Sequence, residues 1–368
     1  MKKEASNTTP AIADTITKSK KRTRKACQLK PKPEPGFTIG DIEDIQFRED
    51  EVADIRSSLL KWYDINHRDL PWRRISEGEA TDDDDEIDRK AYAVWVSEIM
   101  LQQTRVQTVI SYFNRWMDKW PTVHHLAQAC IEEVNEVWAG LGYYRRARFL
   151  LEGAKMVVEE GGKFPRSVSD LRKVKGIGDY TAGAIASIAF KETVPVVDGN
   201  VIRVIARLKT ISANPKDKAT IKNIWRLAGQ LVDNHRPGDF NQAVMELGAT
   251  LCTPLSPSCS SCPVSTQCSA LLKTKHDSSA LVTDYPTKVA KVKQRHDYSA
   301  VTVVEILESE QGTVSTSDSG NLHRKNNKGL MTFKYVDTKT LATMGLSSGV
   351  RKAYNMVQKF RQSRSSLV

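Results

Sequence analysis

Apolar residues recur at three- and four-residue spacings through most of the chain, beginning near Glu49. This spacing is typical of amphipathic helices. It predicts helices over residues 49–67, 91–120, 131–160, 167–174, 180–190, 199–211, 217–234 and 239–251, and Pro121 ends the second of these. No credible run of alternating strand residues precedes residue 297. We therefore predict an all-α core.

The segments around this core have a different composition. Residues 1–45 have few apolar side chains and no sustained periodicity, which predicts a disordered, basic N-terminal tail. The acidic stretch at 76–90 is expected to be an exposed insertion without chemistry. Residues 271–296 are polar and are interpreted as a linker after a core at 46–270. Residues 297–368 then predict a strand at 297–309, a loop at 310–329, and a strand with one or two helices at 331–360.

Charge narrows the range of partners. The chain has 55 Lys and Arg against 44 Asp and Glu, a net charge of +11. Such a balance favours polyanions, with nucleic acid the leading candidate and a merely solvated tail the alternative. The run "KSKKRTRKACQLKPK" holds eight of the basic residues and predicts a nuclear-import signal or a nucleic-acid arm. We expect a nuclear protein, with an organellar form as the alternative. No apolar run of about 18 residues is present, so no membrane span is expected.

Four of the six cysteines lie close together, in "CTPLSPSCSSCPVSTQC". Cys252, Cys259, Cys262 and Cys268 have the spacing C-x6-C-x2-C-x5-C. Four thiolates hold either zinc or an iron–sulfur cluster, and zinc sites usually show two short C-x2–4-C pairs. Only one gap here is that short, which favours one cluster over zinc or over four unliganded thiols.

A glycine turn precedes one of the predicted helices, in "KVKGIGDYTAGAIASIAF". Gly176 and Gly178 allow positive φ and close approach of another backbone. The N–H groups at the start of the following helix can bind a phosphate oxygen. On a basic helical protein this arrangement suggests a DNA backbone, although a purely structural turn explains the glycines as well.

Two carboxylates stand out from the helical pattern. Asp198, in "VVDGNVIRVIARL", precedes a predicted helix and either caps it or serves as a charged group near a reacting sugar. Glu98 lies within the apolar helix "AYAVWVSEIMLQQT". If buried, it has a raised pKa and is a candidate general acid, whereas on the polar face it is an ordinary exposed side chain.

Seven motifs in order give the sequence a resemblance to the helix-hairpin-helix DNA glycosylase superfamily, and most of all to adenine DNA glycosylases of the MutY type. The resemblance covers residues 48–270 and implies two helical lobes, with the hairpin at 171–190 and an iron–sulfur loop at 252–268. The motifs are "LPWRR", "VWVSEIMLQQT", "WAGLGYYRRAR", "GIGDYTAGAI", "VVDGNVIRV", "PGDFNQAVMELGA" and the four-cysteine loop.

The resemblance implies a monofunctional base excision enzyme that removes adenine mispaired with 8-oxoguanine or guanine in double-stranded DNA. By the same resemblance, Glu98 protonates adenine N7 and Asp198 stabilises the sugar cation, with Tyr180 and Asn200 in support. Tyr180 replaces the lysine that in related endonucleases attacks the sugar. One 4Fe–4S cluster on the four cysteines is implied. Residues implied to bind substrate are Leu70, Trp72, Arg73, Gln102, Gln103, Tyr143 and Glu246, and those implied to bind the DNA backbone are Gly176, Gly178 and Thr181.

Structural alternatives remain open for several of these positions. Trp72 and Tyr143 are alternatively core aromatics, and Glu246 is alternatively a helix cap or the ion-pair partner of a nearby arginine. The sequence also departs from the family, since Lys175 stands where a proline is usual.

The C-terminal region resembles the two ends of the Nudix-like domain that reads 8-oxoguanine in the family, without its middle. A shortened form would keep adenine chemistry and lose preference for 8-oxoguanine. The competing hypotheses are a bifunctional endonuclease III-like enzyme and a catalytically weak iron–sulfur DNA-binding isoform. We expect a monomer that contacts repair or replication proteins through the linker.

Overall fold

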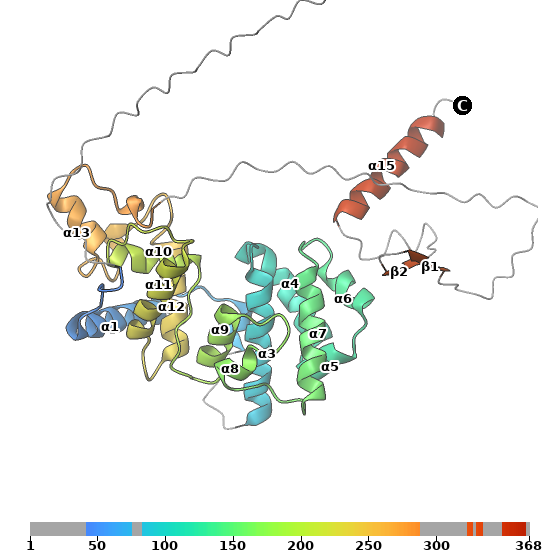
Figure 1. The fold of residues 1–368 in the computed structure, drawn as a ribbon, viewed down its shortest axis with the longest axis horizontal. Coiled ribbons are helices and arrows are strands. Elements are labelled where there is room, and N and C mark those ends of the chain that lie inside the picture. The colour runs from blue at the N-terminus through green and yellow to red at the C-terminus, as the bar shows by residue number, and fades with distance from the viewer. Residues whose placement is uncertain (1–41, 76–82, 288–321, 327–328, 334–347, 366–368) are drawn as a thin grey trace, which may run out of the picture. The chain divides into compact units, whose positions relative to one another are not determined.

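The computed structural model describes residues 42–75, 83–287, 322–326, 329–333 and 348–365 (Figure 1). Within 42–75 and 83–287 it contains helices and no strand, so the predicted all-α core is confirmed. The core helices are α1 (Glu49–Asn66), α2 (Pro71–Arg74), α3 (Asp84–Leu101), α4 (Val106–Lys119), α5 (Val123–Gln128), α6 (Ile131–Trp138), α7 (Arg145–Glu159), α8 (Val168–Leu171), α9 (Asp179–Ala189), α10 (Gly199–Leu208), α11 (Lys218–Leu231), α12 (Pro237–Thr250) and α13 (Ser269–His276).

Local chemistry explains where several helices begin. The side chains of Asp83, Thr122 and Ser167 accept hydrogen bonds from backbone N–H groups in the first turns of α3, α5 and α8. These bonds satisfy donors that have no partner within a helix. Pro71 and Pro237 occupy the first positions of α2 and α12, where a missing N–H has no cost.

Two hydrophobic cores divide the helices into two lobes. The first core is built from α2 to α9, which are consecutive in the sequence. The second is built from α1 together with α10, α11 and α12. Figure 1 shows α1 beside α10–α13 and apart from α3–α7. Met245 on α12 packs against both cores and marks the place where the lobes meet.

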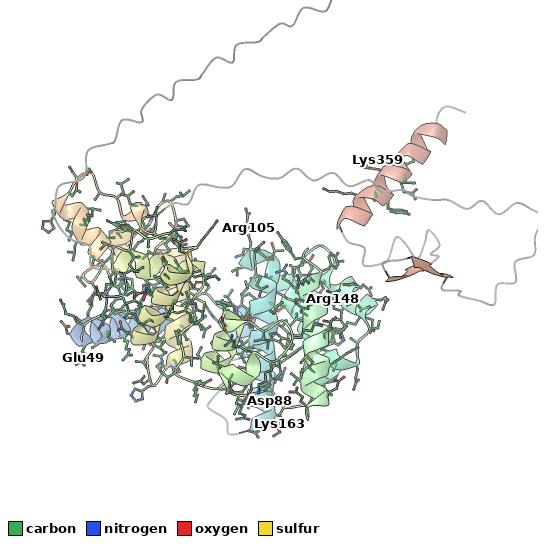
Figure 2. All side chains as sticks on the ribbon, viewed as in Figure 1. Glu49, Asp88, Arg105, Arg148, Lys163 and Lys359 are labelled. Carbon is green, nitrogen blue, oxygen red and sulfur yellow. The ribbon has the colours of Figure 1, made fainter. Side chains whose placement is uncertain are left out.

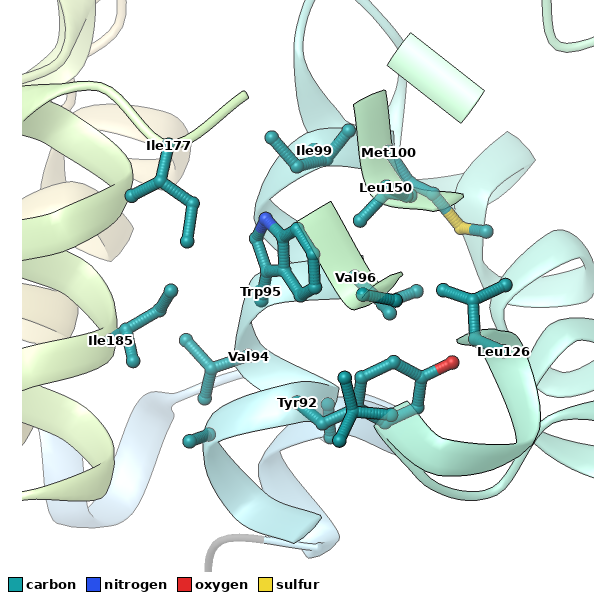
Figure 3. Packing of buried hydrophobic residues seen from close by; sticks show 14 of the residues in the cluster. Tyr92, Val94, Trp95, Val96, Ile99, Met100, Leu126, Leu150, Ile177 and Ile185 are labelled. Atoms are coloured by element: carbon teal, nitrogen blue, oxygen red, sulfur yellow. The ribbon is translucent and has the colours of Figure 1, made fainter. Parts of the chain in front are cut away.

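Helix α3 runs through the middle of the first lobe. Its central residues are buried on all sides, with Trp95 between Ile177 and Ile185 on one side and Leu150 on the other (Figure 3). Gly153 on α7 allows this packing, because a Cβ there would lie 2.8 Å from the Trp95 ring. A helix buried all round holds its side chains in fixed positions.

Two helix predictions and the interpretation of the acidic segment need correction. The stretch predicted as one helix at 91–120 is α3 and α4, separated at residues 102–105, and the stretch at 131–160 is α6 and α7, separated at 139–144. The acidic segment interpreted as an insertion contains the first turn of α3, where Asp84 forms ion pairs with Lys163 and Arg166. Periodic apolar spacing continues across each break, so the spacing alone does not reveal it.

The predicted linker also begins too early. Helix α13 crosses the boundary at residue 271, and the 3-10 turn η2 (Val282–Asp284) follows it. Val282 and Tyr285 are buried against α13, so the packed structure extends beyond the predicted core. Farther along, β1 (Leu322–Asn326) pairs antiparallel with β2 (Gly329–Phe333), and α15 spans Ser348–Ser365. A loop was predicted where β1 lies. The N-terminal tail up to residue 41 and the predicted strand at 297–309 lie outside the described residues.

The surface of the core is charged. Glu49, Arg105 and Arg148 lie on the outside of the two lobes (Figure 2). Among the described residues, no helix is both long enough and apolar enough to cross a membrane.

Candidate active site

A pocket of about 600 Å³ opens where the two lobes meet. This volume is within the range of small-molecule sites, ~300–1,000 Å³. Its walls come from the segment around α2, from α3 and the loop after it, from α9, from the start of α10 and from α12. Among the predicted residues lining it are Leu70, Trp72, Arg73, Glu98, Gln102, Gln103, Tyr180, Asp198, Asn200 and Glu246.

Glu98 is a buried carboxylic acid among these pocket residues. It lies in the last turn of α3 and is 7% exposed, which excludes the exposed alternative. The Tyr180 hydroxyl donates a hydrogen bond of 2.6 Å to Oε2. Burial raises the pKa of Glu98 to about 7, the Tyr180 hydrogen bond opposes the rise, and the charge of Asp198 adds to it. The predicted rise of the Glu98 pKa is confirmed, and a substantial fraction of Glu98 is protonated near neutral pH.

Asp198 is both a helix cap and a pocket wall. Its Oδ1 accepts hydrogen bonds from the backbone N–H groups of Asn200 at 2.9 Å and Val201 at 2.8 Å, at the start of α10. Its Oδ2 accepts a third, of 2.7 Å, from the Asn200 side chain. The capping alternative is therefore confirmed, and the same carboxylate also lines the pocket.

The two carboxyl groups differ in what surrounds them. Burial raises the pKa of Asp198 as well, but the N–H donors from Val201 and Asn200 and the charge of Arg203 oppose that rise. Glu98 accepts a hydrogen bond from a single neutral hydroxyl. N–H donors stabilise the charged form of a carboxylate. The arrangement thus stabilises the charged form of Asp198 more than that of Glu98.

Arg203 on α10 supports Asp198 through Asn200, and it was not predicted from the sequence. Its Nη2 donates to Asn200 Oδ1 at 2.7 Å, and its Nε donates to the carbonyl of Cys252 at 2.8 Å. The spacing of three residues from Asn200 was a visible signal for the first contact. The second contact joins residues 49 apart and depends on the fold.

Glu246 forms the charged centre of another wall. It is 1% exposed. Arg68 donates a hydrogen bond to each oxygen of its carboxylate, at 2.6 and 2.9 Å, and Arg73 donates to Oε2 at 2.9 Å. Burial alone would raise the pKa of Glu246, but the two guanidinium groups outweigh it and lower that pKa. The ion-pair alternative is therefore correct, and Glu246 also faces the pocket.

Two predicted substrate residues have unusual backbone. Gln103, in the loop between α3 and α4, has φ +55°, and Tyr143, between α6 and α7, has φ +48°. Left-handed conformations of non-glycine residues cost about 1–3 kcal/mol each and are concentrated at functional sites. Tyr143 is 66% exposed, which excludes a core role, and it does not line the pocket. Trp72 both lines the pocket and packs edge-on against Phe113.

The predicted hairpin is formed by α8, a short turn and α9. Gly176 has φ +87°, whereas Gly178 has φ −100°, so only the first needs glycine for its backbone. A Cβ on Gly178 would meet nothing within 4 Å, which leaves the start of α9 open to a ligand. Thr181 differs from the prediction, because it is 2% exposed and its side chain is unavailable at this surface. Lys175 forms an ion pair with Glu152 at 2.9 Å.

The four clustered cysteines line one small cavity beside the second lobe. No three His, Cys, Asp or Glu side chains are grouped to hold a single metal ion in the described part of the chain. Buried Arg207 lies beside the thiols, and its Nη1 is 3.2 Å from Cys252 Sγ. The donor set is therefore four sulfurs around a space, with a fixed positive charge next to it.

Comparison with known proteins gives one domain and several relatives. Residues 96–230 match the HhH-GPD superfamily of base excision DNA repair proteins. The chain is 63% identical over 287 residues to the adenine DNA glycosylase of Arabidopsis thaliana and 44% identical over 335 residues to that of Mus musculus. A solved thermostable thymine-DNA glycosylase superposes with a TM-score of 0.52 at 27% identity, covering 61% of this chain and 98% of that one.

These alignments cover unequal shares of the proteins. They include 73% and 82% of this chain, but only 44% of the Arabidopsis protein and 62% of the mouse protein. The chain therefore matches about half the length of these curated relatives.

Proposed function

We propose that this chain is a DNA glycosylase that removes adenine mispaired with 8-oxoguanine or guanine, since residues 96–230 match the HhH-GPD superfamily of base excision DNA repair proteins. One observation carries the proposal: Glu98, whose pKa burial raises to about 7, and Asp198, which accepts backbone hydrogen bonds, line a single pocket. Two carboxyl groups with opposite protonation suit cleavage of a glycosidic bond. The similarity to adenine DNA glycosylases supports adenine as the base.

In the proposed mechanism one proton is given to the base, and one proton returns from water. Glu98 gives its proton to N7 of an adenine that has been flipped out of the duplex. The C1′–N9 bond then breaks, its electron pair leaves with the base, and the sugar becomes a cation beside Asp198. Water adds to C1′, and its proton returns to a carboxylate. The products are free adenine and an abasic site.

Tyr180 supports the proposal that the reaction stops at that point. Strand cleavage through a Schiff base needs an amine at the sugar. Residue 180 is a tyrosine, and its hydroxyl donates a hydrogen bond to Glu98. Among the described residues that line the pocket, none is a lysine.

DNA binding is proposed at three places around the pocket. The open start of α9 offers N–H groups to a phosphate, as helix N-termini do. Gln103 and Tyr143 would enter the base stack beside the flipped adenine, as wedge residues of other proteins do. The exposed cations Arg105 and Arg148 add sequence-independent attraction for the backbone.

Single-turnover release of adenine tests the function. Duplexes with adenine opposite 8-oxoguanine or guanine are incubated with the chain, and strand breaks are measured with and without alkali. Breaks at adenine that require alkali are expected. Breaks without alkali would instead favour the bifunctional enzyme. DNA binding without any adenine release would favour the catalytically weak isoform.

The same assay tests whether 8-oxoguanine is still read. The Nudix-like resemblance at 297–368 is incomplete, so we propose similar rates on the two duplexes. A strong preference for the 8-oxoguanine duplex would contradict this and would leave the adenine chemistry intact. Nuclear import through the basic run at 18–32 is a separate proposal, tested by the location of a fluorescent fusion with and without those residues.

Replacing Asp198 with asparagine separates its two roles. Asparagine is also a good N-cap, so the free energy of unfolding should change by less than about 1 kcal/mol. Loss of the negative charge should slow adenine release by about 10²–10³-fold. Urea unfolding and single-turnover kinetics measure the two effects. Equal kinetics in the two proteins would remove Asp198 from the mechanism.

A 4Fe–4S cluster is proposed on Cys252, Cys259, Cys262 and Cys268. Four sulfurs around one cavity suit a cluster, which takes one thiolate at each iron, and Arg207 offsets the negative charge. When bound, the cluster would hold the loop at 252–268 in place.

Purified chain should contain iron and acid-labile sulfide at about four of each. Cys262→Ser should lose both and unfold at a lower temperature, whereas Cys130→Ser, outside the loop and exposed, should match the unaltered chain. Zinc without sulfide would contradict the proposal.

A further inference from the structure

The two predicted substrate residues with left-handed backbone lie on two different loops. Gln103 follows α3, and Tyr143 precedes α7, and both have left-handed backbone. Such a backbone persists only where the surroundings hold it. Among the hydrogen bonds of the described residues, none joins one loop directly to the other. The contacts that a third residue makes with both loops are therefore informative.

Arg146 makes those contacts. It lies in the first turn of α7 and is 9% exposed. Its Nη1 donates to the carbonyls of Ile99 and Met100 at 3.0 Å each and to that of Gln102, at the end of α3. Its Nη2 donates to the carbonyls of Leu141 and Gly142 at 3.3 Å each, directly before Tyr143.

The guanidinium therefore bridges the two loops. Both of its terminal nitrogens also contact Thr104 Oγ1 at 3.3 Å, next to Gln103. Its central carbon lies 5.5 Å from the centre of the Tyr143 ring. Within the described residues, no ion pair joins Arg146 to a carboxylate. Its charge instead faces carbonyl groups at a helix C-terminus, where a cation is favoured.

The second loop is anchored by two further side chains. Trp138 Nε1 donates to the carbonyl of Gly142 at 2.9 Å, and the Tyr112 hydroxyl donates to that of Ala139 at 2.8 Å. These bonds hold the Tyr143 loop to its own lobe. Only Arg146 donates from one group to carbonyls of both loops, among the hydrogen bonds of the described residues.

We propose that Arg146 is a positioning residue that holds Gln103 and Tyr143 as one wedge, so that both enter the DNA together. The proposal rests on the proposed function, because it assumes that these side chains enter the base stack. It assigns Arg146 to the extrusion of the base and not to bond cleavage. A lysine at this position keeps the charge but cannot reach both loops, since it has one nitrogen in place of a planar fork.

The test follows base unstacking separately from chemistry. All proteins carry Glu98→Gln, and a 2-aminopurine beside the target adenine reports unstacking by stopped-flow fluorescence. Arg146→Lys should slow the fluorescence rise by about ten- to a hundredfold, as expected for misplaced groups. Lys155→Arg, which keeps the charge at an exposed position on the same helix, is the matched control and should show no slowing.

A double substitution distinguishes positioning from general destabilisation. In a Gln103→Ala, Tyr143→Ala background the wedge is absent, so Arg146→Lys should have no further effect on the fluorescence. If it slows the rise equally in both backgrounds, or in neither, the proposal is overturned. If Arg146→Lys does not fold, Thr104→Val removes a shared acceptor and should give the same pattern in weaker form.

The outcome is independent of the adenine assay. The fluorescence requires only binding, whereas adenine release by the chain with Glu98 intact tests the proposed function. A chain that unstacks DNA but releases no adenine would overturn the function and keep the wedge. A chain with Arg146 intact that gives no fluorescence change would overturn the wedge.

Discussion

Glu98→Gln should slow adenine release by about 10²–10⁴-fold, the usual contribution of a general acid. In the unaltered chain the rate should be highest below the Glu98 pKa of about 7 and fall tenfold per pH unit above it, because the protonated fraction falls. Single-turnover rates between pH 5 and pH 9 measure this. A rate that stays level across pH 7 would contradict the assignment.

Glu98→Gln should stabilise the fold at alkaline pH, although it slows adenine release. The pKa of Glu98 is higher in the folded chain than its ordinary value of 4.5, so the folded state binds the proton more tightly. The free energy of unfolding therefore falls as pH rises from about 4.5 to 7. Glu98→Gln removes that loss and should be more stable at pH 8 by on the order of 3 kcal/mol. Urea unfolding at pH 5 and pH 8 measures it, and a variant with the same pH dependence would contradict the burial argument.

Glu246→Gln should cost the fold about 3–5 kcal/mol, because it leaves the Arg73 guanidinium buried without a counter-charge. Asp69→Asn is the matched control. It breaks the exposed pair between Asp69 and Arg74 and should cost less than about 1 kcal/mol. Chemical unfolding at pH 7 compares the two.

Acid provides a second check on Glu246. The pKa of Glu246 is lowered in the fold, so its stabilisation is complete above the ordinary value of 4.5 and is lost as pH falls through the folded value. The two proteins should become more alike in stability as the solution is acidified. A constant difference down to low pH would mean that packing, and not charge, holds Glu246 in place.

Apolar spacing predicted most of the helices but neither functional break in them. Between α6 and α7, Gly140 and Gly142 take positive φ, and their presence in "WAGLGYY" was a visible signal. Between α3 and α4 no glycine or proline marks the break. There Gln103 takes positive φ, and Arg146, from a distant part of the sequence, holds the adjoining carbonyls. Local sequence cannot contain that information.

The candidate site shows the same limit. The protonation of Glu98 depends on burial and on Tyr180, 82 residues away, so only the fold decides between the buried and the exposed alternative for this residue. Arg146 carried a partial signal, since Leu150, Gly153 and Val157 repeat on the same buried face of α7. That buried face indicates which arginine of "YYRRAR" turns inward. It does not indicate which groups that arginine contacts.

The order of helices in the second lobe has a consequence for synthesis on the ribosome. Helix α1 belongs to that lobe, and Arg56 donates to the carbonyls of Gln230, Leu231 and Val232, about 175 residues later. The lobe built from α2 to α9 is continuous and can form as soon as it emerges. The apolar face of α1, with Ile55 and Leu59, has to wait for α11 and α12. A nascent chain halted before residue 237 would therefore expose that face to chaperones and to aggregation.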